Sequence, residues 1–265
     1  MGATHHHAVI TGGSRGIGFA LARQFAGAGF DLVLIARHED ALRRAADDLG
    51  RRYGVKVTPL AEDLSRPSAA ETIATELEAR SIDVEILVNN AGFGTHGPFA
   101  ELSLERELSM LRLNVVCLTE LTRGSGRILN VSSTAGLQPT PLMATYGASK
   151  AYALHFSEAL AAELRGSGVT VTVLCPGAVR TGFQAQAGVE SVTSLERYAM
   201  QPDRVAAIAF RSVQRGRTIV VPGWRNRLMA FGQRFVPRRV VRRLAYRYLQ
   251  EDQDKPNGAG PTPPP

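Results

Sequence analysis

The sequence is poor in the features that mark secreted, membrane-spanning or metal-dependent proteins. Its 265 residues include only two cysteines, Cys117 and Cys175, which argues against a disulfide framework and fits a reducing compartment. No apolar run is long enough to span a membrane, and no signal-peptide pattern opens the chain. The three histidines at residues 5–7 have no partner ligands at a suitable spacing, so we expect no metal site. We therefore expect a cytoplasmic protein.

One segment lacks negative charge altogether. Between Arg204 and Gln250 there are twelve arginines, no lysine and no acidic residue, so this segment carries +12 and the remainder −5 of the net +7. A helix at its end would have a basic face, which fits a solvated surface, an anionic membrane or an acidic substrate such as an acyl-CoA. Nucleic acid is disfavoured, because no recognition motif accompanies the charge. The expected apolar face is Val240, Val241, Leu244, Ala245, Tyr248 and Leu249, and the basic face is Arg238, Arg239, Arg242, Arg243 and Arg247.

Short β-branched apolar runs recur along the chain and alternate with helical patterns. Their continuous apolarity predicts strands buried on both faces, as in a parallel sheet. Strands that alternate with helices imply right-handed crossovers and a doubly wound α/β sheet of about seven strands, with helices on both faces. The expected strands are residues 7–11, 31–36, 55–60, 85–90, 127–132, 169–175 and 218–222, and the clearest helices are 17–28, 39–53, 68–80 and 147–166.

We expect one domain over residues 1–250, because the chain shows no internal repeat and no linker before residue 250. Residues 224–249 form its arginine-rich helical end. The last segment, residues 251–265, lacks apolar residues to bury and is expected to be a disordered tail.

The first expected strand runs directly into a glycine-rich loop, "TGGSRGIG", with glycines at 12, 16 and 18, and then into a helix. Missing β-carbons let a pyrophosphate approach the backbone, and the helix N-terminus supplies N–H groups and a positive dipole end. The position of this loop between a strand and a helix therefore predicts a dinucleotide site.

A second motif, "YGASK", places Tyr146 and Lys150 four residues apart, on the same face of a helix and one turn from each other. Taken alone, such a pair is more often part of a solvated helix face than of a catalytic site. Its meaning depends on the motifs around it.

Together with further motifs, these two resemble the short-chain dehydrogenases/reductases, in their compact single-domain type. The further motifs are "EDLS" with Asp63, "NNAG" at 89–92, Asn114 in "LRLNVV", "NVSS" with Ser133, and "CPGAVRT" at 175–181. They occur in the family's order and extend over roughly residues 6 to 223. The resemblance implies a Rossmann-type fold and an oxidoreductase that transfers hydride between a nicotinamide and a carbonyl or secondary alcohol substrate.

The resemblance also assigns catalytic roles. Tyr146 is expected to exchange a proton with the substrate oxygen, and the ammonium of Lys150 to favour the phenolate. Ser133 is expected to hydrogen-bond the substrate oxygen, and Asn114 to hold a water that connects Lys150 to solvent. The alternatives are that Ser133 caps a strand end and that Asn114 marks a helix kink.

The cofactor is expected to be NADP(H). The second strand ends at Ala36–Arg37, where an NAD site of this type has a carboxylate for the ribose 2′-hydroxyl, and Arg15 adds a second guanidinium for a 2′-phosphate. Glu39 and Asp40 are better explained as the first turn of a helix. The expected cofactor contacts are Gly12, Ser14, Arg15, Gly16, Ile17, Gly18, Arg37, Asp63, Leu64, Asn90, Ala91, Gly92, Tyr146, Lys150, Pro176, Gly177, Val179 and Thr181.

The leading hypothesis is an NADPH-dependent carbonyl reductase, and the rival is a catalytically weak NADP-binding sensor or interaction protein. The substrate is expected to contact the segment from about residue 182 to 203, whose apolar, bulky composition favours a fatty acyl, steroid or other lipid-like ketone. Partners beyond this small molecule are expected to exclude nucleic acid, and the basic end leaves open a peripheral contact with the inner face of an anionic membrane.

One stretch departs from the family pattern. Between Asn114 and Ser133 the helical pattern ends near Thr122, and "RGSG" leads at once into the strand at 127–132. We expect a helix about two turns shorter than in the family, joined to the strand by a nearly extended link. In relatives this helix forms the subunit interface, so the loss puts the usual homo-oligomer in doubt and uncovers apolar surface.

Overall fold

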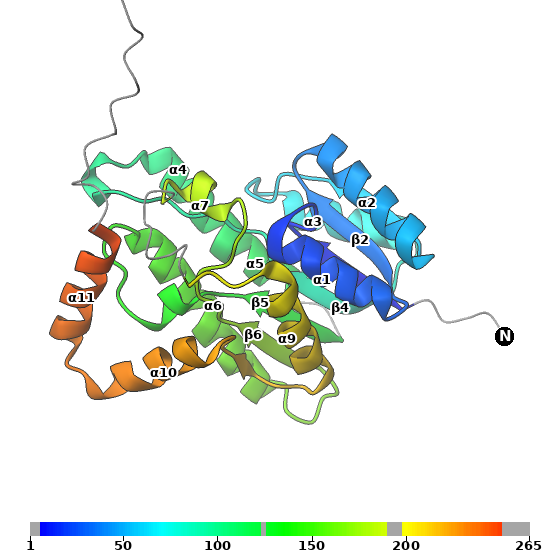
Figure 1. Ribbon diagram of the computed structural model, residues 1–265. Helices are drawn as coiled ribbons and strands as arrows, with labels where there is room; N and C mark the ends of the chain where they lie inside the picture. The colour runs from blue at the N-terminus through cyan, green and yellow to red at the C-terminus, as the bar shows by residue number, and fades with distance from the viewer. Residues whose placement is uncertain (1–5, 123–125, 190–197, 251–265) are drawn as a thin grey trace, which may run out of the picture.

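The computed structural model describes residues 6–122, 126–189 and 198–250. It is an α/β domain built on a seven-stranded parallel sheet with the strand order β3-β2-β1-β4-β5-β6-β7 (Figure 1). The predicted fold class is therefore confirmed. Every strand lies within two residues of its predicted bounds: β1 (His7–Thr11), β2 (Asp31–Ala36), β3 (Val57–Ala61), β4 (Val84–Asn89), β5 (Arg127–Val131), β6 (Thr170–Leu174) and β7 (Ile219–Val220).

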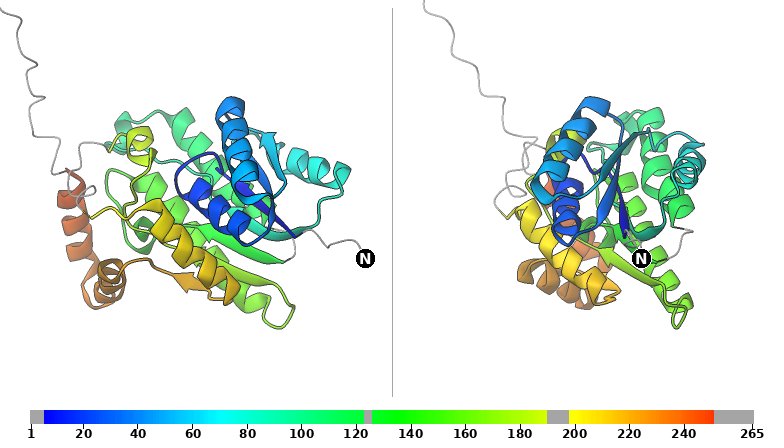
Figure 2. Two further views of the ribbon diagram at one scale, coloured as in Figure 1. Left: turned by 45° about the vertical axis from the view of Figure 1, so that its right-hand side comes forward. Right: turned by 90° about the vertical axis from the view of Figure 1, so that its right-hand side faces the viewer.

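Helices cover both faces of this sheet, as the view in Figure 2 shows. Alternate strand residues point to opposite sides, so Ile10 packs into one apolar core and its neighbour Val9 into the other. The first face is covered by α1 (Gly16–Gly27), α2 (Glu39–Tyr53) and α9 (Pro202–Gln214), and the second by α3 (Ala69–Ala79), α5 (Leu118–Leu121) and α6 (Ala144–Glu163). Helix α4 (Leu104–Leu111) packs against α6.

The helix before β5 ends where the sequence predicts. It continues from α4 through a π-helical segment, η2 (Arg112–Cys117), into α5, which stops at Leu121. The hydroxyl of Thr122 donates to Leu118 O at 2.6 Å and accepts from Asn89 Nδ2 at 3.0 Å, so a buried polar contact ties the helix end to β4.

The link that follows is short for the distance it covers. Gly126 lies beside Glu85, four residues below Asn89 on β4, a drop of about 13 Å at about 3.3 Å per residue. Four extended residues reach about 14 Å. Residues 123–125 are outside the described residues, so the extended link stays a prediction, as does the comparison with the family's helix length.

The arginine-rich end forms two helices beside the sheet, α10 (Trp224–Gly232) and α11 (Arg238–Gln250), joined by the 3-10 turn η4 (Gln233–Phe235) (Figure 1). The predicted apolar face of α11 is only partly covered, since Ala245 and Leu249 are buried while Val240 and Leu244 are exposed. Among the described residues, no helix combines the length and apolarity that a membrane span requires.

Candidate active site

A cavity of about 1000 Å³ opens at the carboxyl ends of the strands. The glycine loop, the ends of β2 and β4, the start of α6 and the C-terminal helices all contribute to its wall. It brings together the predicted site residues with two exceptions, Gly18 and Asn114, which lie behind its wall. In a doubly wound sheet this is where ligands bind.

The glycine loop fits a dinucleotide phosphate. Gly12 and Gly16 have positive φ values of 66° and 59°, which L side chains rarely adopt. A β-carbon at Gly18 would lie 2.2 Å from Gly12 O, so this glycine lets α1 pack against the loop. Among the described residues, no side chain caps the N-terminus of α1 and its first turn has no acid, which leaves its N–H groups for an anion.

Hydrogen bonds of Thr11 and Asn90 fix the position of the glycine loop. The hydroxyl of Thr11 accepts from the backbone N–H groups of Asn90 at 2.9 Å and Ala91 at 3.0 Å. The side-chain amide of Asn90 donates to Thr11 O and, at 3.3 Å, to Gly12 O. Asn90 therefore fixes the loop through its side chain while its backbone borders the cavity.

The end of β2 lacks a carboxylate on the cavity wall and presents Arg37 instead. Burial opposes ionisation of Asp63, but hydrogen bonds from Ser65 and the nearby charge of Arg37 outweigh it and lower the pKa of Asp63. Glu39 forms a salt bridge with Arg43 in the first turns of α2. This pairing agrees with the expectation that Glu39 belongs to the first turn of the helix and not to the cofactor site. Arg15 differs from its expected position, since its guanidinium donates to Gln186 Oε1 at 3.0 Å.

Ser133 follows β5 and begins the 3-10 turn η3 (Thr134–Leu137). Its hydroxyl accepts from Ala135 N at 3.1 Å and lies 3.5 Å from Pro176 O. The serine thus caps a turn and faces the cavity at the same time, so the capping alternative and the catalytic one do not exclude each other.

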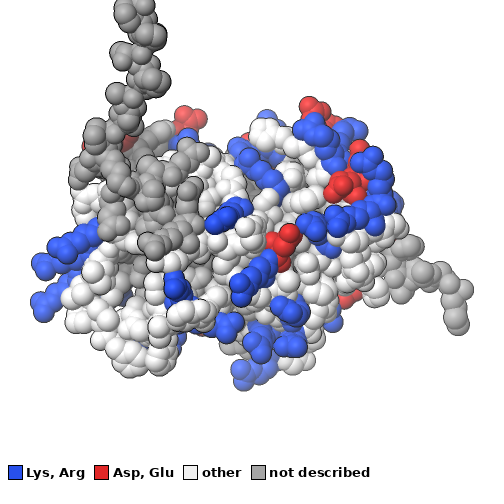
Figure 3. All heavy atoms as spheres, viewed as in Figure 1, with Lys and Arg blue, Asp and Glu red and all other residues white. Residues whose placement is uncertain are grey.

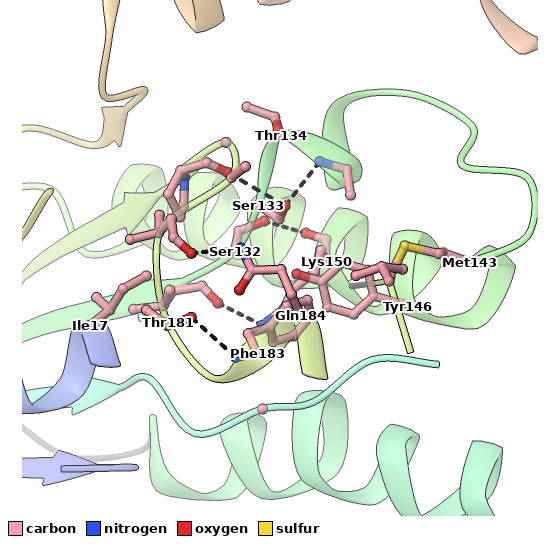
Figure 4. A pocket seen from close by; sticks show the side chains of 18 of the residues that line it. Ile17, Ser132, Ser133, Thr134, Met143, Tyr146, Lys150, Thr181, Phe183 and Gln184 are labelled. Carbon is pink, nitrogen blue, oxygen red and sulfur yellow. Dashed lines mark hydrogen bonds between the residues drawn. The ribbon is translucent and has the colours of Figure 1, made fainter. Parts of the chain in front are cut away.

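Tyr146 and Lys150 project from the first turns of α6 on the same face, beside Ser133 (Figure 4). The ammonium of Lys150 donates to Val131 O at 2.9 Å and lies 5.9 Å from the centre of the Tyr146 ring. The hydroxyl of Ser132 donates to the Lys150 carbonyl at 2.6 Å. These contacts anchor α6 to the end of β5.

Both groups are almost fully buried, and burial sets their pKa values. It raises the pKa of Tyr146 to about 12, against the opposing effect of a hydrogen bond with Ser133. It lowers the pKa of Lys150 to about 8. Burial of the tyrosine therefore opposes the phenolate that Lys150 is expected to favour.

Asn114 lies in the π-helical segment, and such segments often occur at functional sites. Its amide donates to Phe93 O and to Ser149 Oγ, both at 3.0 Å. A β-carbon at Gly92 would lie 2.9 Å from Asn114 Oδ1 and 3.2 Å from Lys150 Nζ, so both polar atoms lie beside Gly92.

The segment after β6 closes one side of the cavity. Pro176, Gly177, Val179 and Thr181 line it, as predicted. Helix α7 (Phe183–Ala187) follows, and its Phe183 ring lies 5.3 Å from the Tyr146 ring (Figure 4).

The sequence did not predict which residues bind α7, or that the C-terminal helices form the far wall of the cavity, opposite the glycine loop. Arg106 donates to Gln186 O at 2.7 Å, so Arg106 and Arg15 both bind α7. Helices α10 and α11 form the far wall, and the apolar pattern of α11 was the signal that could have found it. The lining residues on these helices and on the turn between them include Asn226, Met229, Val236, Val241, Leu244, Arg247 and Tyr248. The predicted substrate segment at 182–203 lies partly in 190–197, outside the described residues.

Comparison with known proteins decides the family. The short chain dehydrogenase model matches residues 6–191, well over half of the chain. The chain belongs to the short-chain dehydrogenase/reductase family. Residues 6–191, the segment that the family model matches, are therefore a short-chain dehydrogenase/reductase domain.

Three relatives illustrate the range of this family. The chain is 38% identical over 189 residues to a short chain dehydrogenase of Pseudocercospora fijiensis, with 67% of this chain and 61% of the relative aligned. It is 34% identical to the very-long-chain 3-oxoacyl-CoA reductase of Anas platyrhynchos, covering 66% and 60%. It is 31% identical to the ketoacyl reductase HetN of Nostoc, covering 69% and 67%. The alignments thus span about three fifths to two thirds of these relatives' lengths.

Three solved structures share the fold. A short-chain dehydrogenase from Sphingobium yanoikuyae in complex with NADPH is 29% identical, with a TM-score of 0.77 over 97% of this chain and 100% of that one. A 7beta-hydroxysteroid dehydrogenase is 26% identical, with a TM-score of 0.82 over 91% and 96%. A short chain dehydrogenase/reductase from Burkholderia phymatum in complex with NAD is also 26% identical, with a TM-score of 0.77 over 91% and 95%.

Proposed function

We propose that this protein is an NADPH-dependent reductase of carbonyl compounds, able to run in reverse as an alcohol dehydrogenase. The observation that carries the proposal is the gathering of Ser133, Tyr146 and Lys150 in the cavity that the glycine loop also lines. A protein that only binds a nucleotide does not need this set. The nicotinamide, when bound, supplies the hydride.

The protein's own residues handle the proton and the substrate oxygen. With its pKa raised to about 12, Tyr146 is a neutral phenol at physiological pH and donates its proton to the oxygen as the carbonyl is reduced. The hydroxyl of Ser133 holds that oxygen and stabilises the charge that develops on it. Lys150 stabilises the phenolate that remains, and Asn114, which lies with Lys150 beside Gly92, holds the water that returns a proton.

We propose NADP(H) over NAD(H) because Arg37 stands at the end of β2 on the cavity wall. A guanidinium there forms charge-assisted hydrogen bonds with a 2′-phosphate, whereas the ribose of NAD prefers a carboxylate. Glu39, the nearest acid after it, is already paired with Arg43. Arg15 can add a second contact if it leaves Gln186.

The substrate is proposed to be an apolar ketone such as a fatty acyl, steroid or other lipid-like compound. Beside Tyr146 the cavity continues into an apolar region formed by Phe93, Met143, Val189 and Leu249. Such a wall favours an apolar body, while the polar groups at Tyr146 and Ser133 orient its carbonyl. Two relatives named for ketoacyl substrates support this class.

We also propose a cytoplasmic location with peripheral contact to the inner face of an anionic membrane. Both Cys117 and Cys175 are free and buried, as a reducing compartment allows. The acid-free arginine-rich end supplies the charge for the membrane contact.

The decisive experiment compares Tyr146→Phe with Tyr152→Phe, an exposed tyrosine on the same helix. NADPH oxidation is followed by absorbance against a panel of ketones that includes 3-oxoacyl thioesters, and NADPH binding by fluorescence. We expect Tyr146→Phe to lose turnover by a factor of about 100 or more while its NADPH affinity changes little, because only the proton donor is removed. Near-normal turnover of Tyr146→Phe would overturn the assignment. NADPH binding without turnover by the unmodified protein would favour the sensor alternative.

A further inference from the structure

An apolar stripe lies on the outer side of α10 and η4, away from the cavity. Its residues, Trp224, Leu228, Phe231 and Phe235, are spaced by four, three and four positions and so fall on one side of a helix. Their exposed fractions are 69%, 63%, 58% and 74%. The opposite side of the same helix, which carries Met229, faces the cavity. Four large side chains are thus left in contact with water.

Helix α11 adds a basic surface next to this stripe. Between Trp224 and Gln250 the chain has eight arginines and no acidic residue. Arg239 and Arg243 are exposed and lie on the side of α11 opposite the buried Ala245. Figure 3 shows an uncharged lobe where α10 lies, with Lys or Arg side chains at its edge where α11 lies.

Neither the residues that follow Gln250 nor a second copy of this chain is a good binding partner for this surface. The residues that follow Gln250, "EDQDKPNGAGPTPPP", contain no large apolar side chain that could cover the stripe. A second copy would meet the stripe through a symmetric interface, which brings the arginines of one copy against those of the other. Like charges placed opposite each other disfavour that contact.

We propose that this C-terminal surface, made of the four stripe residues and the exposed arginines of α11, docks onto an anionic phospholipid bilayer. Aromatic and leucine side chains enter the headgroup region of a bilayer, and arginines beside them attract anionic lipids. The amphipathic arrangement of apolar stripe and acid-free basic surface is what such an interfacial contact requires.

Docking here would place the part of the cavity wall that α10 and α11 form next to the lipid. Met229, Val236 and Leu244 line the cavity and yet are 62%, 37% and 58% exposed, so the wall between cavity and surface is open and apolar at this point. An apolar ketone dissolved in the bilayer can then reach Tyr146 without crossing water. This consequence rests on the proposed reductase function, whereas the docking itself does not.

The test is sedimentation of the full chain with two kinds of vesicle, phosphatidylcholine alone and phosphatidylcholine mixed with an equal amount of phosphatidylglycerol. We expect binding to the mixed vesicles and little to the neutral ones, with the difference lost at high salt. Equal binding to both, or to neither, would overturn the proposal.

Matched variants separate the two parts of the surface. Phe231→Ser with Phe235→Ser removes half of the stripe, and Arg239→Gln with Arg243→Gln removes two charges; none of these residues lines the cavity. Each arginine removed should weaken binding to the mixed vesicles about fivefold. The controls are Leu104→Ser, which is 65% exposed on α4, and Arg44→Gln on α2. If the controls weaken binding as much as the surface variants, the surface is wrongly assigned.

Activity and assembly are measured on the same samples. Reduction of a water-soluble ketone should be unchanged in the surface variants, while reduction of a long-chain ketone held in mixed vesicles should fall with their binding. Vesicle binding without turnover of any ketone would support docking and contradict the proposed function. A dimer in sedimentation velocity that Phe231→Ser with Phe235→Ser dissociates would contradict docking, since the stripe would then bind a second copy.

Discussion

Replacing Lys150 by methionine should stabilise the cofactor-free protein while it impairs turnover. The ammonium of Lys150 is buried in the folded protein, and burial lowers its pKa from the ordinary 10.5 to about 8. Methionine has a similar length and no charge to desolvate. The substitution therefore removes the free-energy cost of burying a charge. The folded protein tolerates this cost because the site needs the ammonium.

The size of that cost follows from the pKa values. A lowering from 10.5 to about 8 disfavours the ammonium by about 3 kcal/mol in the folded state. Because the unfolded chain binds the proton more tightly, the cost is full below about pH 8 and is relieved as the pH rises toward about 10.5. Between about pH 7 and about pH 9.5 it falls by about 2 kcal/mol. Loss of the hydrogen bond from Lys150 to Val131 O offsets about 1–2 kcal/mol of the gain at every pH.

Urea unfolding of both proteins without cofactor, at about pH 7 and about pH 9.5, measures this difference. We expect Lys150→Met to be more stable by about 1–2 kcal/mol near neutral pH, and this advantage to shrink by about 2 kcal/mol at the higher pH. Lys56→Met, at an exposed lysine, is the control and should show no such pH dependence. An advantage that is the same at both pH values, or absent at both, would refute the reasoning.

Three further predictions concern the cofactor site and assembly. Arg37→Asp should lower the preference for NADPH over NADH, measured as the ratio of kcat/KM values, by about 10- to 100-fold, while Arg44→Asp leaves it unchanged. Gly18→Ala should weaken NADPH binding about tenfold or more in a fluorescence titration, because its β-carbon would lie 2.2 Å from Gly12 O and displace the loop; an unchanged Kd would contradict this. Sedimentation velocity should show weak self-association, and a tight dimer that Val116→Arg on the exposed side of η2 dissociates would show that the helix still forms the usual interface.

Much of the fold was predictable because the strands are buried on both faces and read as continuous apolar runs. β2 and α2 were placed at their observed bounds, and the other strands within two residues. The location of Ser133, Tyr146 and Lys150 in one cavity was predictable too, since each follows or begins an element at the same edge of the sheet. The resemblance to the family depended on the order of the motifs along the chain, because no single motif was specific enough.

The electrostatics of the site could not be predicted to the same degree. Spacing places Tyr146 and Lys150 on one helical face, but it does not say how deeply that face is buried. Burial reverses the expected direction for the tyrosine, whose pKa is raised and not lowered. The contacts of Arg15 and Arg106 with Gln186 were equally out of reach, because they join residues far apart in the chain through exposed, flexible side chains.

The C-terminal helices show what an amphipathic pattern can and cannot establish. Such a pattern says that an apolar face needs a partner, but it does not identify the partner. In α11 only Ala245 and Leu249 of the predicted face are buried, while Val241, Leu244 and Tyr248 border the cavity and Val240 is exposed outside it. In α10 the stripe of Trp224, Leu228 and Phe231 has no cover among the described residues. The apolar face that the fold leaves open, beside a surface without acidic residues, fits the anionic bilayer proposed above, because such a bilayer is both apolar and anionic.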